Sequence, residues 1–422
     1  MPKWTPMNPS ESGEQARIAA EAVARRSYGK LVAFLAARTH DVAAAEDALS
    51  EAFASALESW PRNGCPANPE GWLLSVARRK LIDSFRTQRR DETRAVELQA
   101  MAEAIDSAPD DGEIPDDRLA MMFACAHPAI DAGIRAPLIL QAVMGLDARR
   151  IASAFLTSPT AMGKRLVRAK DKIRQAGIPF RVPGRDELPT RLDAVLDAIY
   201  ASFTEGWTDP AGTDVARNDF AEEALYLATL VAGLLPNEAE ALGLLALILH
   251  AHARRNARRS RDGDFVPLAD QDQALWDAQQ IAQAESLLLR ASSLNSMGRF
   301  QLEAALQSAH VHRCRSGESN WPHVIKLYDA LFSITASPVV AINRALAIAE
   351  LHGPDAALNA MPDQVSDARL TQYQPYWAVR AELMSRIGSN SEAHAAYEIA
   401  IGLERDPVVR RFLESRRSAL AN

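Results

Sequence analysis

The sequence predicts an all-α protein, with two small helical domains, the second carrying a helix-turn-helix, followed by a long helical-repeat half. Apolar residues recur at helical spacing in two basic stretches, 68–90 and 145–174. From residue 191 onward helix follows helix, and no strand alternation is sustained over several residues. We therefore expect a flexible N-terminus at 1–14, helical domains at 15–90 and 118–178, an acidic linker at 91–117, and a C-terminal extension at 186–422.

The composition is typical of an ordinary globular protein. Of the 422 residues, 24% are charged and 48% are hydrophobic, and no apolar run reaches the roughly 18 residues of a membrane span. The first residues lack the apolar core of a secretory signal. Cys65, Cys125 and Cys314 are scattered, a spacing that indicates neither a disulfide framework nor a paired metal motif. We therefore expect a cytoplasmic protein without membrane association.

The first domain combines an acidic helix with a basic one. Residues 41–60 are amphipathic, with Asp47 and Glu51 four residues apart on the polar side. A loop with a proline follows, and residues 68–90 then alternate apolar positions at helical spacing with arginines and a lysine.

Residues 145–174 predict a helix-turn-helix with a basic second helix. The first helix has one apolar face, formed by Leu146, Ile151, Ala152 and Phe155. Ser158 is a good N-cap, and Pro159 then occupies the first helical position, where its missing N–H costs nothing. The second helix carries six cations, Lys164, Arg165, Arg168, Lys170, Lys172 and Arg174. Such a helix can enter a major groove. The alternative is a solvated basic helix in a helical hairpin.

The charge is unevenly distributed along the chain. The net charge of −7 argues at first against nucleic acid, but cations concentrate at 78–94 and 149–185. Acids concentrate at 91–117 and 186–240. A DNA-binding half joined to an acidic half would give this balance.

Three sets of motifs occur in a characteristic order. The first is Ala45-Glu46-Asp47 with Glu51 and Phe53. The second is Asn68-Pro69 with Trp72-Leu73, Ala77-Arg78 and Asp83. The third is Gly145-Leu146, Ile151-Ala152 and Ser158, followed by Arg165-Leu166 and Arg168-Ala169-Lys170. In this order and at this spacing the chain resembles the extracytoplasmic-function (ECF) sigma factors of bacterial RNA polymerase. Gly163 departs from the family, which often has a small polar residue there.

The resemblance implies roles for individual residues. In the family, the acidic helix docks on core RNA polymerase, which points to Asp47 and Glu51. The start of the basic helix captures an unstacked base of the melted downstream promoter element, which points to Asn68, Trp72, Ser75, Arg78, Arg79, Lys80 and Arg86. For Trp72 the alternative is a core aromatic residue. The recognition helix reads the upstream element with Ser158, Thr160, Lys164, Arg165 and Arg168 nearest the DNA. The linker 91–117 would thread close to the polymerase active-site cleft, or serve only as a solvated tether.

The C-terminal half resembles a subgroup of these factors with a tetratricopeptide-like extension. The resembling residues include Tyr200, Phe203-Thr204-Glu205-Gly206, the run from Glu240 to Leu247, Trp276-Asp277 and Ser337-Pro338. One repeat-like unit consists of Gly388, Ala393, Tyr397, Ala400 and Pro407. Stacked hairpins of this kind leave grooves for peptides or helices.

The motifs of catalysis and cofactor binding are not found in the sequence. It contains no nucleophile motif, phosphate loop or zinc-hydrolase helix. His310, His312 and Cys314 are candidate metal ligands, but on a helix only His310 and Cys314 point the same way and could share an ion. Because a metal site usually needs four ligands, we expect no metal site and no cofactor.

The sequence thus predicts a non-enzymatic sigma factor that binds core RNA polymerase and promoter DNA. Its C-terminal half would act in cis, by intramolecular docking, or recruit a regulatory protein. One alternative is a polymerase-independent helix-turn-helix regulator with a helical sensor half. Another is an enzyme or ligand binder in the C-terminal half, which would show a pocket with convergent polar groups.

Overall fold

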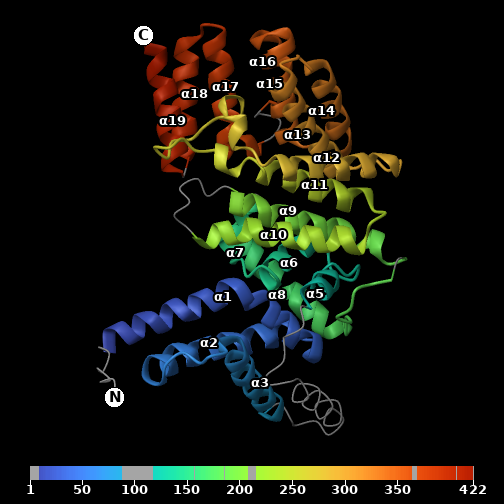
Figure 1. Ribbon diagram of the computed structural model, residues 1–422, viewed down its shortest axis with the longest axis vertical. Helices are drawn as coiled ribbons and strands as arrows, with labels where there is room; N and C mark the ends of the chain where they lie inside the picture. Colours follow the sequence, from blue (N-terminus) through green and yellow to red (C-terminus); the bar gives the residue numbers. More distant parts are fainter. Residues whose placement is uncertain are drawn as a thin grey trace. The chain divides into compact units, whose positions relative to one another are not determined.

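The computed structural model describes residues 9–87, 117–155, 157–184, 186–207, 215–363, 368–404 and 406–421 (Figure 1). In these residues every extended element of regular structure is a helix, and the only strand-like feature is an isolated bridge between Arg259 and Phe265. The all-α prediction is confirmed. The predicted linker, except for Asp117, lies outside the described residues, as do the first eight residues of the predicted flexible N-terminus.

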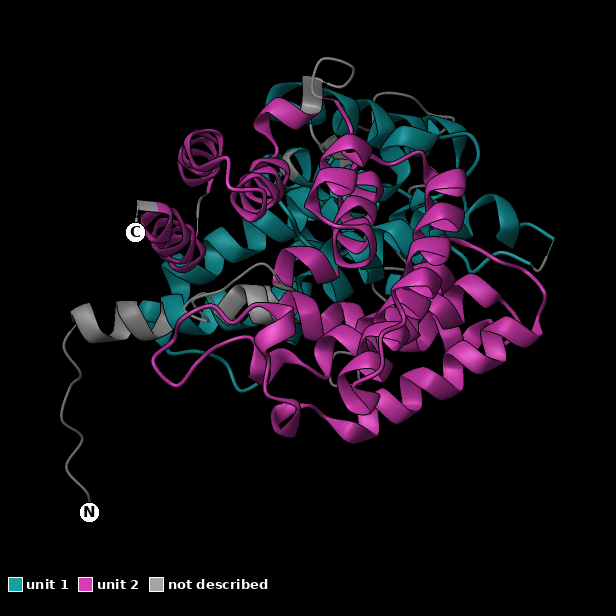
Figure 2. Cartoon of the chain, turned by 90° about the horizontal axis from the view of Figure 1, so that it is seen from above, with its two compact units in different colours: residues 1–202 teal, residues 203–422 magenta. Residues whose placement is uncertain are grey.

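The chain divides into two compact units, Met1–Ser202 and Phe203–Asn422, coloured separately in Figure 2. This division counts residues 186–202, which we assigned from sequence to the C-terminal extension, with the first unit. The limits of the functional domains stay predictions.

The first unit is a set of helices of unequal length. They are α1 (Pro9–Thr39), α2 (Val42–Asn63), α3 (Pro69–Thr87), α5 (Arg118–Cys125), α6 (Ala132–Ala142), α7 (Ala148–Ala154), α8 (Pro159–Ala176) and most of α9 (Leu192–Trp207). Helix α2 begins where the Asp41 carboxylate accepts a hydrogen bond from the Ala44 amide (3.1 Å), and it buries one face against α1 and α3.

Helices α7 and α8 form the helix-turn-helix that the sequence predicts. Ser158 is the N-cap of α8, accepting a hydrogen bond from the Ala161 amide (3.3 Å), and Pro159 is the first helical residue. Gly177 ends α8 in the left-handed conformation. Leu146, Ile151 and Ala152 are buried as expected, but Phe155 is 36% exposed, because the helix ends at Ala154 and Phe155 already belongs to the turn.

Two glycines allow the α1–α3 helices to approach the α5–α8 helices closely. A Cβ atom at Gly29 on α1 would lie 1.8 Å from the carbonyl oxygen of Val143, which follows α6. Gly145, with φ +67°, packs against the Tyr28 ring, which a Cβ would approach to 3.2 Å. The two helical groups of this unit are therefore in direct contact through backbone.

The second unit is a succession of helices, most of which pack on the next one in the chain. They are α10 (Val215–Leu234), α11 (Ala239–His252), α12 (Ala278–Ser293), α13 (Arg299–Ser316), α14 (Trp321–Thr335), α15 (Pro338–His352), α16 (Pro354–Ala360), α17 (Gln374–Arg386), α18 (Asn390–Leu403) and α19 (Pro407–Ser418). In Figure 1, α17, α18 and α19 stand side by side, and each contacts the next.

Helix α11 forms the centre of its neighbourhood. Every residue from Ala241 to His252 is buried, and the helix packs against α10, α12 and α13. The Glu240 carboxylate accepts hydrogen bonds from the Phe300 and Gln301 amides (2.9 and 3.0 Å) at the start of α13. The carboxylate thereby satisfies two of the amides that a helix N-terminus leaves unpaired.

The repeat-like unit coincides with α18 and its ends. Gly388, at φ +82°, lies between α17 and α18, and Ala393, Tyr397 and Ala400 are buried in the pairing of these helices. Pro407 opens α19. Whether this half is a tetratricopeptide-like array stays a prediction.

The two helical glycines Gly29 and Gly163 predict opposite effects of the same substitution. Gly163→Ala should stabilise α8 by about 1 kcal/mol, because nothing lies within 4 Å of the added methyl group. Gly29→Ala should destabilise the unit by roughly 1–3 kcal/mol, because the methyl group meets backbone. Peptide-resolved hydrogen exchange of α1, α6 and α8 in the full chain measures both. Equal responses of the two variants would show that α1 does not pack closely on Val143.

Candidate promoter and polymerase interface

The acids predicted to bind polymerase are exposed on α2. Asp47 and Glu51 lie one turn apart at its surface. Glu51 is engaged, since the Lys80 ammonium lies 2.9 Å from its carboxylate. The hydrogen bond and charge of Glu51 raise the pKa of Lys80. The structure thus pairs a predicted polymerase contact with a predicted DNA contact across α2 and α3, and both side chains stay exposed.

The start of α3 is shaped by Asn68 and Trp72. The Asn68 side-chain oxygen accepts a hydrogen bond from the Gly71 amide (3.0 Å), which makes Asn68 a capping residue. Trp72 is half-buried, and its ring meets the buried Trp60 edge to face with centroids 5.6 Å apart. Ser75, one turn on, is also half-buried. Trp72 therefore packs on the core and keeps part of its surface accessible.

The basic residues of α3 fall into two groups. Arg79 and Lys80 are exposed. Arg78 is only 7% exposed, and its guanidinium lies 5.4 Å from the centre of the Phe34 ring on α1. The side chain of Arg86 lies outside the described residues. Among the predicted downstream contacts whose side chains the structure describes, Arg78 is the buried one.

Helix α8 presents one polar face to solvent. Thr160, Lys164 and Arg168 are exposed and follow one another at intervals of four residues, so they form a single stripe; Ser158, the N-cap, is exposed at its beginning. Arg165 lies beside the stripe and is bound to its own domain. Its guanidinium donates to the Gly133 carbonyl (2.9 Å) and lies 3.7 Å from Asp131, at the start of α6.

The side of α8 between its exposed stripe and its buried face, which Met162, Leu166, Ala169 and Ile173 form, contacts α2 through ion pairs. Lys170 pairs with Glu46, and the two side chains are only 11% and 14% exposed. One turn on, Arg174 lies 3.7 Å from Asp41, the residue that caps α2. Sequence reasoning missed this contact, although Glu46 and Lys170 both stand within the motifs quoted above. Their charge alone does not distinguish this buried pair from the exposed acids and cations that are close by in the sequence.

Burial dominates the electrostatics of this contact. It raises the pKa of Glu46, and the attraction and hydrogen bond of Lys170 oppose that rise only in part. Because the folded-state pKa is raised, the contribution of Glu46 to stability is present at low pH and is lost as the pH rises through the folded-state pKa. The ion pair therefore specifies how α8 seats on α2 more than it stabilises the fold.

The described residues contain no group of three histidine, cysteine or acidic side chains arranged to hold a metal ion. Their helices are also too short or too polar to span a bilayer.

Comparisons with known proteins match both parts of the chain. Residues 23–91 match the family model of sigma-70 region 2, and residues 191–292 match a family of unknown function (DUF6596). An uncharacterized protein of Rhizobium meliloti (strain 1021) is 37% identical over 364 residues, which cover 85% of this chain and 86% of that protein. A probable RNA polymerase sigma factor, RfaY, of Xanthomonas campestris pv. campestris is 31% identical over 222 residues, which cover 49% of this chain and 52% of that protein. No solved structure matches the chain.

The chain therefore belongs to one family with the rhizobial protein. The residues that match region 2 fall mainly in α1–α3, which include the exposed acids of α2 and the exposed cations of α3. Together with the likeness to RfaY, this match supports an RNA polymerase sigma factor, whose family implies core RNA polymerase and promoter DNA as partners. The ECF class and the individual contacts stay predictions.

A double-mutant cycle tests the seating of α8 on α2. Glu46→Leu or Lys170→Met alone should destabilise the contact by roughly 3 kcal/mol, because each leaves a buried charge without its partner. The double variant should be close to wild type, because the apolar pair removes both desolvation costs. Hydrogen exchange of α8 amides reports each effect. Additive losses in the double variant would mean that the two groups do not interact.

Proposed function

We propose that this protein is a sigma factor of the ECF class, which binds core RNA polymerase, recognises promoter DNA and promotes strand opening. The observation that carries the proposal is the exposed stripe Thr160–Lys164–Arg168 on a capped helix-turn-helix, which follows a region 2 match in the same chain. A stripe of this kind fits a major groove, with the N-terminal turn near base edges and the cations near phosphates.

Two faces of α2 would have different roles in the first unit. Asp47 and Glu51 are free of the α8 contact, so a cationic surface of core polymerase can reach them without dissociating α8. Docking there would exchange the Lys80–Glu51 pair for an intermolecular one and release Lys80 toward the DNA strand. Asn68 and Trp72 at the start of α3, and the exposed Arg79 in its middle, would receive the melted downstream element. Arg78 would not contact DNA in this arrangement but would pack against the Phe34 ring inside the domain.

Free chain should bind DNA weakly. Two of the cations on α8, Lys170 and Arg174, already face carboxylates of α2, so they contribute little to phosphate binding. Arg165 would fix the position of α8 on α6 and border the DNA from there. Core polymerase would then supply most of the affinity that places the stripe on the upstream element.

We also propose that the C-terminal unit regulates initiation in cis. Residues 203–240, at the start of this unit, carry eight acids against one arginine, a charge opposite to that of α8, and electrostatic attraction acts over about 8 Å at physiological salt. A truncated chain that tests this regulation should end after Trp207, so that it keeps the whole of α9. Leu188, Arg191 and Leu196 are buried in the first unit, and Arg191 donates to the Phe123 carbonyl (3.2 Å).

Strand opening should require core polymerase. With core enzyme, the full chain should make promoter thymines reactive to permanganate. The chain alone should give weak, salt-sensitive DNA binding and no reactivity, because α8 is partly occupied by α2. Lys164→Ala should weaken the specific complex by roughly 1–3 kcal/mol if Lys164 contacts a base.

Lys326→Ala is the matched control, since it removes an exposed lysine from α14 of the other unit. Thymine reactivity without core enzyme, or tight binding of the free chain to a palindrome, would identify a polymerase-independent regulator. In the same assay, truncation after Trp207 should change the yield of open complex. An unchanged yield would refute regulation in cis while leaving the sigma role intact.

Core binding should depend on Glu51 and not on its internal partner. Glu51→Arg should lower the affinity for core polymerase at least about tenfold, because it places like charges at the interface. Lys80→Ala should leave that affinity unchanged or raise it, since it frees the Glu51 carboxylate. Competition against a labelled sigma factor measures both. Equal losses in the two variants would indicate that the pair only stabilises the fold.

A further inference from the structure

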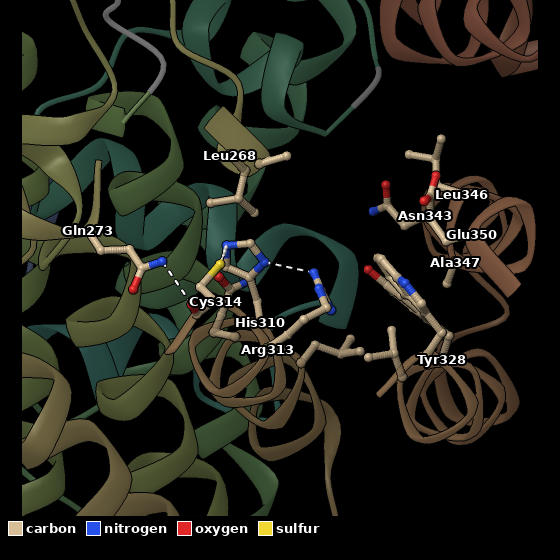
Figure 3. A pocket seen from close by; sticks show the side chains of 15 residues that line it. Leu268, Gln273, His310, Arg313, Cys314, Tyr328, Asn343, Leu346, Ala347 and Glu350 are labelled. Atoms are coloured by element: carbon tan, nitrogen blue, oxygen red, sulfur yellow. Dashed lines mark hydrogen bonds between the residues drawn. The ribbon is translucent and has the colours of Figure 1, made fainter. Parts of the chain in front are cut away.

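The second unit contains a cavity bordered by three successive helices. Helices α13, α14 and α15 and the short 3-10 helices Leu268–Asp270 and Gln273–Leu275 border an open cavity of about 700 Å³. This volume lies within the range of small-molecule pockets. In Figure 3, His310, Arg313 and Cys314 of α13 face Tyr328, Asn343 and Leu346 across open space.

Arg313 projects a guanidinium at this cavity without a carboxylate. It lies over the Trp321 ring at 3.9 Å from the centroid and donates to the Asn320 side-chain oxygen (3.1 Å). Its other nitrogen lies 2.9 Å from His310 Nδ1. No ion pair of Arg313 occurs in the described part of the chain. Stacking and two hydrogen bonds therefore fix the guanidinium plane, and its charge stays uncompensated.

A second guanidinium lies behind the wall of the cavity. Arg254 is 6% exposed, and it donates to the lining residue Gln307 (2.5 Å) and to the His250 carbonyl (3.1 Å). The described residues offer Arg254 no carboxylate either. Burial and the neighbouring Arg258 lower the pKa of Arg254 to about 10, so it stays cationic at neutral pH. Two buried or stacked cations without acids create a positive potential at this end.

The other titratable groups of the cavity are neutral, apart from one carboxylate that already has a partner. Burial, Arg254 and Arg313 lower the pKa of His310 to about 4, so its ring is uncharged and accepts the Arg313 hydrogen bond. Burial raises the pKa of Tyr328 to about 12, so its phenol is a neutral donor. The one acid among the lining residues, Glu350, is paired with Arg386 (2.7 Å).

Apolar side chains line the cavity on both sides. Leu306 of α13 and Leu268 lie on the side of Arg313, and Val324, Leu346 and Ala347 belong to α14 and α15. The guanidinium of Arg313 thus suits an anion, and these side chains suit a hydrocarbon or aromatic body. A molecule with both features would satisfy the uncompensated guanidinium and remove apolar surface from water.

We propose that this cavity is a binding site for a small monocarboxylic acid with an apolar body. The carboxylate binds Arg313, with the potential of Arg254 behind it. The body lies between Leu268, Leu306 and Leu346. This site lies wholly within the second unit and does not depend on the role proposed for the first. It gives that unit a ligand class, and a ligand that binds across three helices stabilises their packing.

Calorimetric titration of the full chain tests the proposal. The probes are phenylacetate and hexanoate, each compared with its uncharged amide, phenylacetamide and hexanamide. Both acids should bind with dissociation constants below about 1 mM and raise the melting temperature, and the amides should bind at least about tenfold more weakly. No binding of either acid at about 10 mM would overturn the proposal. Equal binding of acid and amide would overturn it as well, because the guanidinium would then play no part.

Variants locate the binding. Arg313→Gln should weaken phenylacetate at least about tenfold. Asn343→Phe should weaken it too, by filling the cavity from an exposed position of α15 that the fold tolerates. Arg315→Gln is the matched control, since it removes an exposed cation two residues further along α13, outside the cavity. Unchanged binding in both Arg313→Gln and Asn343→Phe, or an equal loss in Arg315→Gln, would overturn the site.

Discussion

The buried pair between Glu46 and Lys170 is the contact on which the electrostatics of the first unit depend. It holds α8 on α2 at the edge of the buried face of α8, while Thr160, Lys164 and Arg168 stay in solvent. An ion pair this buried gains little net free energy, because desolvation offsets the attraction. Its effect is positional: an α8 rotated about its axis would bury an uncompensated lysine. The pair therefore decides which cations of the helix are available to DNA.

In the second unit a carboxylate has the equivalent positional role. Glu240, from the buried helix α11, accepts two amide hydrogen bonds at the start of α13. A Cβ at Gly243 would lie 2.6 Å from the Gln301 nitrogen, so the two helices meet there at backbone distance. Helix α13 is thus fixed at its first turn, and its last turns carry His310, Arg313 and Cys314 to the cavity. The stretch from Glu240 to Leu247, which resembles the sigma subgroup, therefore holds the helix that forms one wall of the cavity.

The two units differ in how their charged groups are paired. The first unit keeps acids and cations paired in the free chain, at Glu51 with Lys80 and at Glu46 with Lys170. Each such pair is a contact that a partner of one sign can displace. The second unit instead leaves Arg254 and Arg313 without acids. A net charge of −7 conceals both facts, because it sums over groups that differ in burial and partnership.

Local patterns in the sequence determined much of this protein. Helical periodicity predicts the all-α fold, and Ser158 and Pro159 predict the start of α8 to the residue, because capping and proline geometry involve only neighbours in the chain. The amphipathic pattern of 41–60 likewise places Asp47 and Glu51 at the surface. These predictions depend on short-range interactions alone.

The tertiary structure decided what each charge does. Arg78 and Arg79 are adjacent arginines on one helix, yet one packs over Phe34 and the other is exposed. Arg165 turns to Gly133 while Lys164 stays in solvent. The cavity beside Arg313 likewise needs α13, α14 and α15 brought together. Whether a charged side chain is buried and paired depends on residues distant in the sequence. Lys170, for example, is paired because Glu46 lies beside it in the fold. Composition and spacing therefore give the helices and their cations, and only long-range packing selects those that are free to bind.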